Sequence, residues 1–418
     1  MRLASILLCL LLSAPGALLA AEAGEGCEAA ARCIDPATLG GKSLAQAYVD
    51  RGLTLHGEGH YDLAIADFSE ALRLQPRDTF ALKSRGNSWV QKNDPARALG
   101  DYEAAIRIEP DFADAIHNRG TLARDRGDYA AAMKDFNRAI AIQPGKALYY
   151  RNRAQTWQLQ NDGNRALADF DRAIKLDPSR ALYYSERAHL QMARKDHARA
   201  LADYDEAVHL DSASALYPWQ RGKALFHLRQ YENAAADFAL AVRLDRNAPR
   251  LQLSWAEALH ANGESSNALA IYRLMLEKAP DYADAYVERG KLWADNGNCE
   301  RALADYDAAQ KLSPTLGRAF ALRGMCRDTL GDTTAALDDF EQAIRHDPKE
   351  AAPHAGRALI LRRQGKDDAA LAAFSRAVEL DANFDFAWYQ RAELRRARGE
   401  FNAAIKDYDR AIALAPRY

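Results

Sequence analysis

A proline recurs at intervals of 34 residues along most of this chain. The positions that lack it keep the same count and carry Ser212, Arg246 and Ala382 instead. The prolines are Pro76, Pro110, Pro144, Pro178, Pro280, Pro314, Pro348 and Pro416. A fixed period of this length predicts a solenoid, in which each repeat packs only against its neighbours and the stack offers a long surface for holding other molecules.

Eleven repeats of 34 residues, counted from Ala45, fill the chain to Tyr418. Residue 24 of each repeat is Phe or Tyr, which supplies the core, and residue 8 is Gly or Ala, which lets two helices approach closely. Gly or Asn at residue 15 in nine repeats predicts the end of a first helix, and the proline ends a second one. The predicted repeats are 45–78, 79–112, 113–146, 147–180, 181–214, 215–248, 249–282, 283–316, 317–350, 351–384 and 385–418.

The second half of the repeat resembles the tetratricopeptide repeat family. Its pattern is Ala, three residues, an aromatic residue, two residues and Ala, with Pro five residues later, as in Ala166, Phe170, Ala173 and Pro178. The resemblance covers residues 45–418. It implies an all-α fold, a right-handed α-solenoid of about eleven tandem helix-turn-helix units, with first helices lining a concave groove and second helices forming the convex back. It implies no particular ligand.

Residues 1–23 have the composition of a secretory signal peptide. Arg2 precedes an apolar stretch, and Ala21-Glu22-Ala23 offers a small-x-small cleavage site. Pro15 and Gly16 interrupt the stretch, which is short for a membrane span of ~20 apolar residues, although an uncleaved anchor stays open as the alternative. Residues 24–44 form a segment ahead of the repeats. We expect a protein of the exported bacterial type, periplasmic, with no integral membrane domain after cleavage.

Export would leave four cysteines, an even number that permits two disulfides in an oxidising compartment. We expect local pairs, with Cys27 bonded to Cys33 and Cys299 bonded to Cys326, the second pair joining adjacent repeats. The alternative is that these cysteines are free thiols that fill buried helical positions.

Composition and motifs indicate a binding protein and no enzyme. The 56 basic and 58 acidic residues give a net charge of −2, which does not suggest a surface for nucleic acid. The chain has no His-Glu-x-x-His pair, no phosphate-binding glycine loop and no nucleophile elbow. His56, His60 and His117 lack the spacing of metal ligands, and we expect them to be solvated. We predict no cofactor, no metal, and a protein or peptide partner.

Charged residues recur within the repeat. Residue 7 is Arg in ten repeats and residue 23 is Asp in nine. The seventh repeat has Trp255 and Ile271 in these places, whereas the tenth keeps Arg357 but has Ala373. A planar guanidinium suits a carboxylate, so we expect ion pairs between the two helices of a repeat. The alternative is an arginine ladder that binds an acidic ligand.

Variation among the first helices indicates where a ligand would bind. A leucine recurs at residue 2 of repeats four to six, and three residues of the sixth repeat share one helical face. Such a strip suits an extended or helical peptide held by aromatic anchors. The alternative is that these residues fill space between repeats. The groove candidates are Leu148, Arg151, Leu182, Leu216, Trp219, Lys223 and Phe226.

Lys83, Asn87 and Asn118 resemble three of the five residues with which tetratricopeptide co-chaperones hold a C-terminal carboxylate. Cations would complete that set at 148 and 152, where this chain has Leu148 and Asn152, and Arg151 is the nearest substitute. The resemblance therefore implies only a partial carboxylate clamp, and an exported protein would not meet those cytosolic partners.

No capping helix follows the last repeat in this sequence. We expect self-association or partner contact there through Trp388, Tyr389 and Phe401. Our main hypothesis is a scaffold or adaptor that binds protein segments in its concave groove. The alternatives are a self-associating structural component of an envelope or secretion assembly, and, because aromatic rings also stack on sugars, a protein that binds a glycan or cell-wall polymer.

Overall fold

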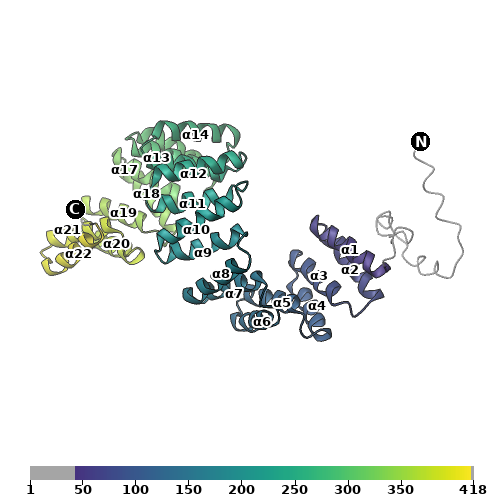
Figure 1. The fold of residues 1–418 in the computed structure, drawn as a ribbon. Helices are drawn as coiled ribbons and strands as arrows, with labels where there is room; N and C mark the ends of the chain where they lie inside the picture. The colour runs from purple at the N-terminus through teal and green to yellow at the C-terminus, as the bar shows by residue number, and fades with distance from the viewer. Residues whose placement is uncertain (1–42, 416–418) are drawn as a thin grey trace, which may run out of the picture. The chain divides into compact units, whose positions relative to one another are not determined.

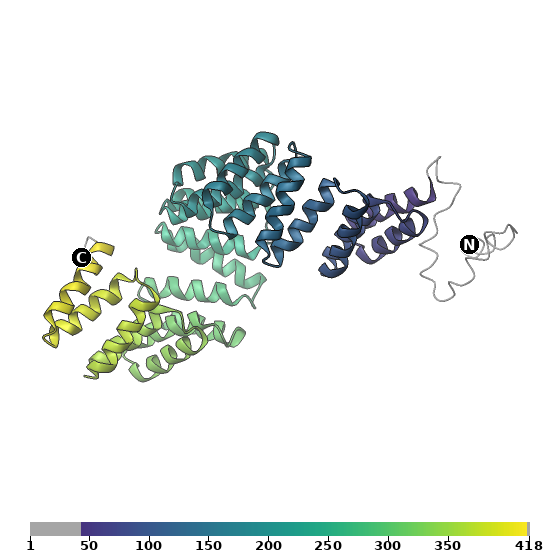
Figure 2. The ribbon, with the colours of Figure 1, turned by 90° about the horizontal axis from the view of Figure 1, so that it is seen from below.

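The computed structural model describes residues 43–415, which form 22 α-helices and no β-strand. The helices follow one another as antiparallel pairs (Figures 1 and 2), so the predicted all-α solenoid is confirmed. We call the odd-numbered member of each pair the first helix and the even-numbered member the second helix. The predicted signal peptide, Cys27 and Cys33 lie outside the described residues. None of the described helices is both long and apolar enough to cross a membrane.

The chain divides into an N-terminal part, residues 1–190, and a C-terminal part, residues 191–418, with the boundary inside α9. The helices up to this boundary are α1 (Leu44–Gly57), α2 (Tyr61–Leu74), α3 (Thr79–Gln91), α4 (Pro95–Ile108), α5 (Ala113–Asp125), α6 (Tyr129–Ile142), α7 (Ala147–Leu159), α8 (Gly163–Leu176) and α9 (Ala181–Ala193). The helices that follow are α10 (His197–Leu210), α11 (Leu216–His227), α12 (Tyr231–Leu244), α13 (Pro249–Ala261), α14 (Ser265–Lys278), α15 (Ala283–Asp295), α16 (Cys299–Leu312), α17 (Gly317–Thr329), α18 (Thr333–His346), α19 (Ala351–Arg363), α20 (Asp367–Leu380), α21 (Asp385–Ala397) and α22 (Phe401–Leu414).

A residue in the left-handed backbone region lies two positions after the last residue of each first helix. Residue 15 of the repeat has positive φ in every repeat, including Lys195 (φ 64°) and Arg229 (φ 59°), which have a side chain where most repeats have Gly. The predicted helix end is therefore confirmed. Glycine adopts this conformation without steric cost, whereas a lysine or arginine is strained there.

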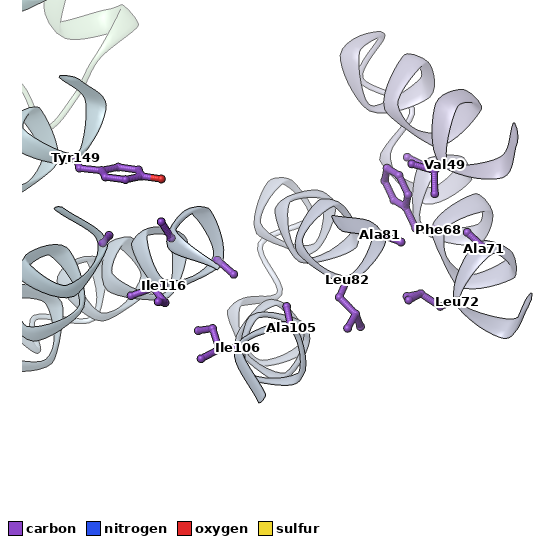
Figure 3. Packing of buried hydrophobic residues seen from close by; sticks show 14 residues of the cluster. Val49, Phe68, Ala71, Leu72, Ala81, Leu82, Ala105, Ile106, Ile116 and Tyr149 are labelled. Atoms are coloured by element: carbon purple, nitrogen blue, oxygen red, sulfur yellow. The ribbon is translucent and has the colours of Figure 1, made fainter. Parts of the chain in front are cut away.

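The aromatic residue at position 24 packs against the small residue at position 8. A Cβ placed on Gly52 would lie 2.8 Å from Cε1 of Phe68, and one on Gly86 would lie 2.6 Å from Cε1 of Tyr102. Phe68 belongs to a buried cluster that runs from α1 to α7 (Figure 3). Close approach of the paired helices is thus compatible only with a small residue at position 8, as the sequence predicts.

Within each part, the second helix of a repeat packs against the first helix of the next repeat, and successive first helices also touch. Contacts join α1 to α3, α3 to α5 and α5 to α7, and in the C-terminal part α13 to α15, α15 to α17 and α17 to α19. Each of these first helices also packs against the second helix of its own repeat. These contacts join the first helices from α1 to α7 and from α13 to α19. We call the side formed by the first helices of each part the first-helix face, and the groove candidates lie on the first helices α7, α9 and α11.

The predicted ion pairs between residues 7 and 23 are confirmed. The arginine donates from Nε and Nη2 to a buried aspartate at distances between 2.6 and 3.2 Å. The pairs are Arg51–Asp67, Arg85–Asp101, Arg119–Asp135, Arg153–Asp169, Arg221–Asp237, Arg289–Asp305, Arg323–Asp339 and Arg391–Asp407. Nε of Arg357, opposite Ala373, is buried and has no hydrogen-bond partner among the described residues.

Many of these arginines also reach back to residue 25 of the preceding repeat. Nη1 of Arg221 donates to Asp205 at 2.7 Å, and Nη1 of Arg323 donates to Asp307 at 2.6 Å. Arg153 donates in the same way to Asn137. One guanidinium therefore joins both helices of its own repeat to the repeat before it.

Candidate functional site

Three of the predicted groove residues line one cavity in the N-terminal part. Leu148 and Arg151 of α7 and Leu182 of α9 surround a volume of about 490 Å³. The two leucines occupy the same position in successive first helices, which places them side by side on the first-helix face. Tyr183 and Leu176 add apolar surface, and the remaining lining residues are Gly145, Lys146, Ala147, Asp177 and Arg180. We call this space the leucine cavity.

The cations of the leucine cavity differ in how firmly they are held. Arg151 binds Glu186 through two hydrogen bonds of 2.8 and 2.5 Å, and the hydrogen bond to Glu186 raises the pKa of Arg151. Nζ of Lys146 lies 3.8 Å from the carboxylate of Asp114, and Nε of Arg180 lies 3.5 Å from the carboxylate of Asp177. Both cations are at exposed positions. Exposed ion pairs of this length are worth ~0–1 kcal/mol, so these two cations are free to exchange partners. The charge of Arg151 is instead compensated internally.

Trp219 of α11 lies in a cluster of the C-terminal part. Its Nε1 donates to Oγ of Ser254 at 3.2 Å. Nζ of Lys223 lies 4.7 Å and the guanidinium of Arg250 lies 4.4 Å from the ring centroid, both within cation–π range. The ring is therefore fixed in place and partly covered by cations, which leaves less of it open for stacking on a sugar.

The other two candidates on α11 have different surroundings. Phe226 packs edge-on against Tyr231, with ring centroids 5.1 Å apart, and contacts the core of the C-terminal part. Leu216 is exposed at the start of α11. The structure thus groups the seven groove candidates into the leucine cavity in one part and the Trp219 cluster with Leu216 and Phe226 in the other.

The partial carboxylate clamp is not assembled as a single site. Nδ2 of Asn118 donates to Oδ1 of Asn87 at 2.8 Å, and the hydroxyl of Tyr102 donates to the same oxygen at 2.8 Å. These residues line a cavity of about 250 Å³ that also contains the carboxylate of Asp125 but not Lys83. Lys83 lies instead 4.1 Å from the ring of Phe80, and burial lowers its pKa. Lys83 and the two asparagines therefore do not line one cavity, and the carboxylate clamp stays a prediction.

His117 extends the asparagine pair into a polar chain across three first helices. Its Nδ1 lies 3.0 Å from Oδ1 of Asn118, and its Nε2 lies 2.7 Å from Nδ2 of Asn152. Nδ1 therefore donates and Nε2 accepts. The expectation of a solvated His117 is wrong, because the ring is buried and stacks on Tyr149 at 4.7 Å. This burial lowers the pKa of His117 to about 4.

Carboxylates gather on the first-helix face of α13 and α15, where the sequence analysis proposed no site. Glu288 is buried and pairs with Arg318 at 2.5 Å. Burial, together with the nearby charge of Glu288, raises the pKa of Glu257 to about 7. On the same helices, Nε2 of His260 lies 2.9 Å from Asp295. No group of His, Cys, Asp and Glu residues in the described part of the chain has the arrangement of a metal site.

Cys299 and Cys326 are free thiols in the structure, and both are buried. They belong to one buried cluster with Tyr306. Burial, followed by the neighbouring thiol of Cys299, raises the pKa of Cys326 to about 12. The predicted disulfide between them stays a prediction, now with both partners in contact.

Sequence comparison identifies the repeat. Models described as tetratricopeptide repeat match residues 84–147, 160–216, 219–283, 253–316 and 327–383, and further models with that description match residues 45–78 and 385–418. Together these matches cover more than half of the chain. No curated protein matches the chain.

The chain is also similar to several solved structures. Yeast Tom70 is 17% identical over 88% of this chain and 96% of its own, with a TM-score of 0.48. A structure of the APC/C hetero-tetramer Cut9–Hcn1 is 12% identical, covers 90% of this chain and 95% of its own, and has a TM-score of 0.47. A tetratricopeptide repeat protein from Parabacteroides merdae is 20% identical, covers 59% of this chain and 98% of its own, and has a TM-score of 0.44.

Proposed function

Because the chain belongs to the tetratricopeptide repeat family, we propose that it is an exported, periplasmic scaffold that binds an extended segment of another protein on its first-helix face. Repeats of this family form scaffolds for protein interactions, and the all-helical stack supports that role. Export rests on the composition of residues 1–23.

The leucine cavity is the observation that carries the proposal. Leu148 and Leu182 offer an apolar surface to a side chain of the bound segment, and Lys146 and Arg180 stand beside it with weakly held charges. A segment with an apolar residue next to a carboxylate would satisfy both features, because apolar anchors supply affinity and charges at the rim fix the register.

Photocrosslinking tests this proposal. A photoreactive amino acid at Leu182 should crosslink a protein partner in the native compartment, identified by mass spectrometry. Adding Leu148→Glu on α7 should remove that crosslink. Leu159→Glu, also on α7 at a position that is 52% exposed, should leave the crosslink unchanged. Crosslinks that persist with Leu148→Glu would move the binding surface away from the leucine cavity.

Self-association is the second candidate, and the exposed face of α22 favours it. Phe401, Ile405 and Ile412 are 63%, 56% and 53% exposed and lie on one helix. Of the other two predicted contact residues, Trp388 packs into a core cluster and donates Nε1 to the carbonyl of Ala382, and Tyr389 lies edge-on to Tyr408. Light scattering should show assembly that rises with concentration and is lost in Ile405→Glu. A monomer at all concentrations would exclude this role.

A further inference from the structure

Three departures from the repeat pattern meet in one cavity of the C-terminal part. Trp255 occupies residue 7 of its repeat, where the other ten have Arg, and Ile271 occupies residue 23, where nine repeats have Asp. Arg246 replaces the proline of the preceding repeat. All three line a single space of about 250 Å³, which we call the Trp255 cavity.

The walls of the Trp255 cavity are apolar and come from α12, α13 and α14. Val242, Ile271 and Leu274 face it together with Trp255, and Leu274 is 56% exposed. In eight other repeats, the same positions hold an arginine and an aspartate that pair with each other, as Arg221 and Asp237 do at 2.6 Å. Their replacement by Trp and Ile leaves an apolar opening with room for one large apolar side chain.

The rim of the Trp255 cavity is cationic. Arg243, Arg246 and Lys278 line it, and no carboxylate does. None of these three makes an ion pair within residues 43–415, whereas most arginines of the repeat pattern are paired. The adjacent Asp245 accepts instead from the backbone N–H of Asn247 at 3.1 Å. Three uncompensated cations around an apolar floor complement a negatively charged ligand.

The Trp255 cavity is separate from the first-helix face. Trp255 and Glu257 are two residues apart on α13, so their side chains project in nearly opposite directions, about 160° apart. Trp255 packs against the core cluster with Ile271, while Glu257 lies near Glu288 on the first-helix face. A ligand in the Trp255 cavity would therefore leave that face of the C-terminal part accessible.

We propose that the Trp255 cavity is a second binding site, for an acidic protein segment that inserts one large apolar side chain. The apolar side chain contacts Trp255, Ile271 and Leu274, and the carboxylates beside it pair with Arg243, Arg246 and Lys278. Positive charge at the rim selects acidic segments and speeds their association at low salt. The scaffold thereby holds two protein segments at once.

Fluorescence anisotropy tests the site with a labelled peptide that has one central phenylalanine flanked by glutamates. Full-length protein should bind this peptide at least tenfold more tightly than a peptide with lysines in place of the glutamates, or one with alanine in place of the phenylalanine. Leu274→Glu should weaken binding at least tenfold, because it places a carboxylate at the apolar opening of the cavity. Raising the salt concentration should weaken binding further.

Matched variants separate loss of the site from loss of the fold. Leu159→Glu, at a similarly exposed leucine of the N-terminal part, should bind as wild type. Trp255→Arg combined with Ile271→Asp restores the usual ion pair and should abolish binding while circular dichroism stays unchanged. The proposal is overturned if all peptides bind equally or none binds, if Leu274→Glu binds normally, or if laurate binds at the site and the acidic peptide does not.

Discussion

At the residue scale, the repeat reveals which side chains lack their usual partner. Arg357 keeps the arginine of the pattern, but Ala373 has replaced the aspartate, and Nε of Arg357 is left buried without a hydrogen bond. Every aspartate that fills this position in the pairs described above is buried, so the site accommodates the carboxylate. A buried donor without an acceptor costs about 1–3 kcal/mol.

Ala373→Asp should therefore stabilise the protein by about 1–2 kcal/mol, because it supplies the missing acceptor for Arg357. The gain is measured as a higher urea midpoint and melting temperature. In an Arg357→Met background the same substitution should be destabilising, because the new carboxylate is then buried without a partner. Equal effects in both backgrounds would show that the pair does not form.

The buried ring of His117 makes stability depend on pH. Its pKa is about 4 in the folded protein and 6.5 in an unfolded chain, so stability is complete above pH 6.5 and is lost as the pH falls towards 4. The loss amounts to about 3 kcal/mol once both pKa values are passed. Urea unfolding at pH 7 and pH 4.5 should show a smaller decline for His117→Gln than for wild type. Parallel declines would mean that His117 does not titrate as described.

At the element scale, the sequence predicts contacts whose two partners lie in the same repeat. Helix ends at residue 15, the ring against residue 8 and the Arg–Asp pairs recur many times, so their pattern is visible without a structure. Apart from the proximity of Cys299 and Cys326, contacts between repeats were not predicted, as when Arg250 covers Trp219 or Asn152 meets His117. They depend on how successive first helices are offset and which rotamers fill the gap, and neither follows from a position count.

Cys299 and Cys326 illustrate a contact between neighbouring repeats, because the packing of α16 against α17 places the two thiols in one buried cluster. Oxidation should join them in a disulfide, which by the chain-entropy estimate stabilises the fold by about 3 kcal/mol. Mass spectrometry of unreduced peptides would detect the bond, and Cys299→Ser would remove both the bond and the gain. A protein from an oxidising compartment with both thiols free would contradict this prediction.

At the scale of the whole molecule, the free energy of unfolding is the sum of the stabilities of the single repeats and of the interfaces between neighbouring repeats. Tyr306 is fully buried in the C-terminal part, and Tyr306→Ala should cost about 3–5 kcal/mol. Hydrogen exchange should quicken in α15, α16 and α17 but stay unchanged in α1 to α6, since repeats interact only with their neighbours. A uniform loss of protection along the chain would instead indicate a single cooperative unit.

The arginine that bonds both its own aspartate and residue 25 of the preceding repeat has a consequence for how such arrays change in length. A duplicated repeat of this kind carries the donor for the junction before it and the acceptor for the junction after it, so it can be gained or lost while this bond between repeats is kept. The two junctions of the seventh repeat are exceptions, because Ala239 and Trp255 replace both members of the first and Arg273 replaces the acceptor of the second. The seventh repeat is therefore specific to its two neighbours, and we expect that moving it within the array is not tolerated.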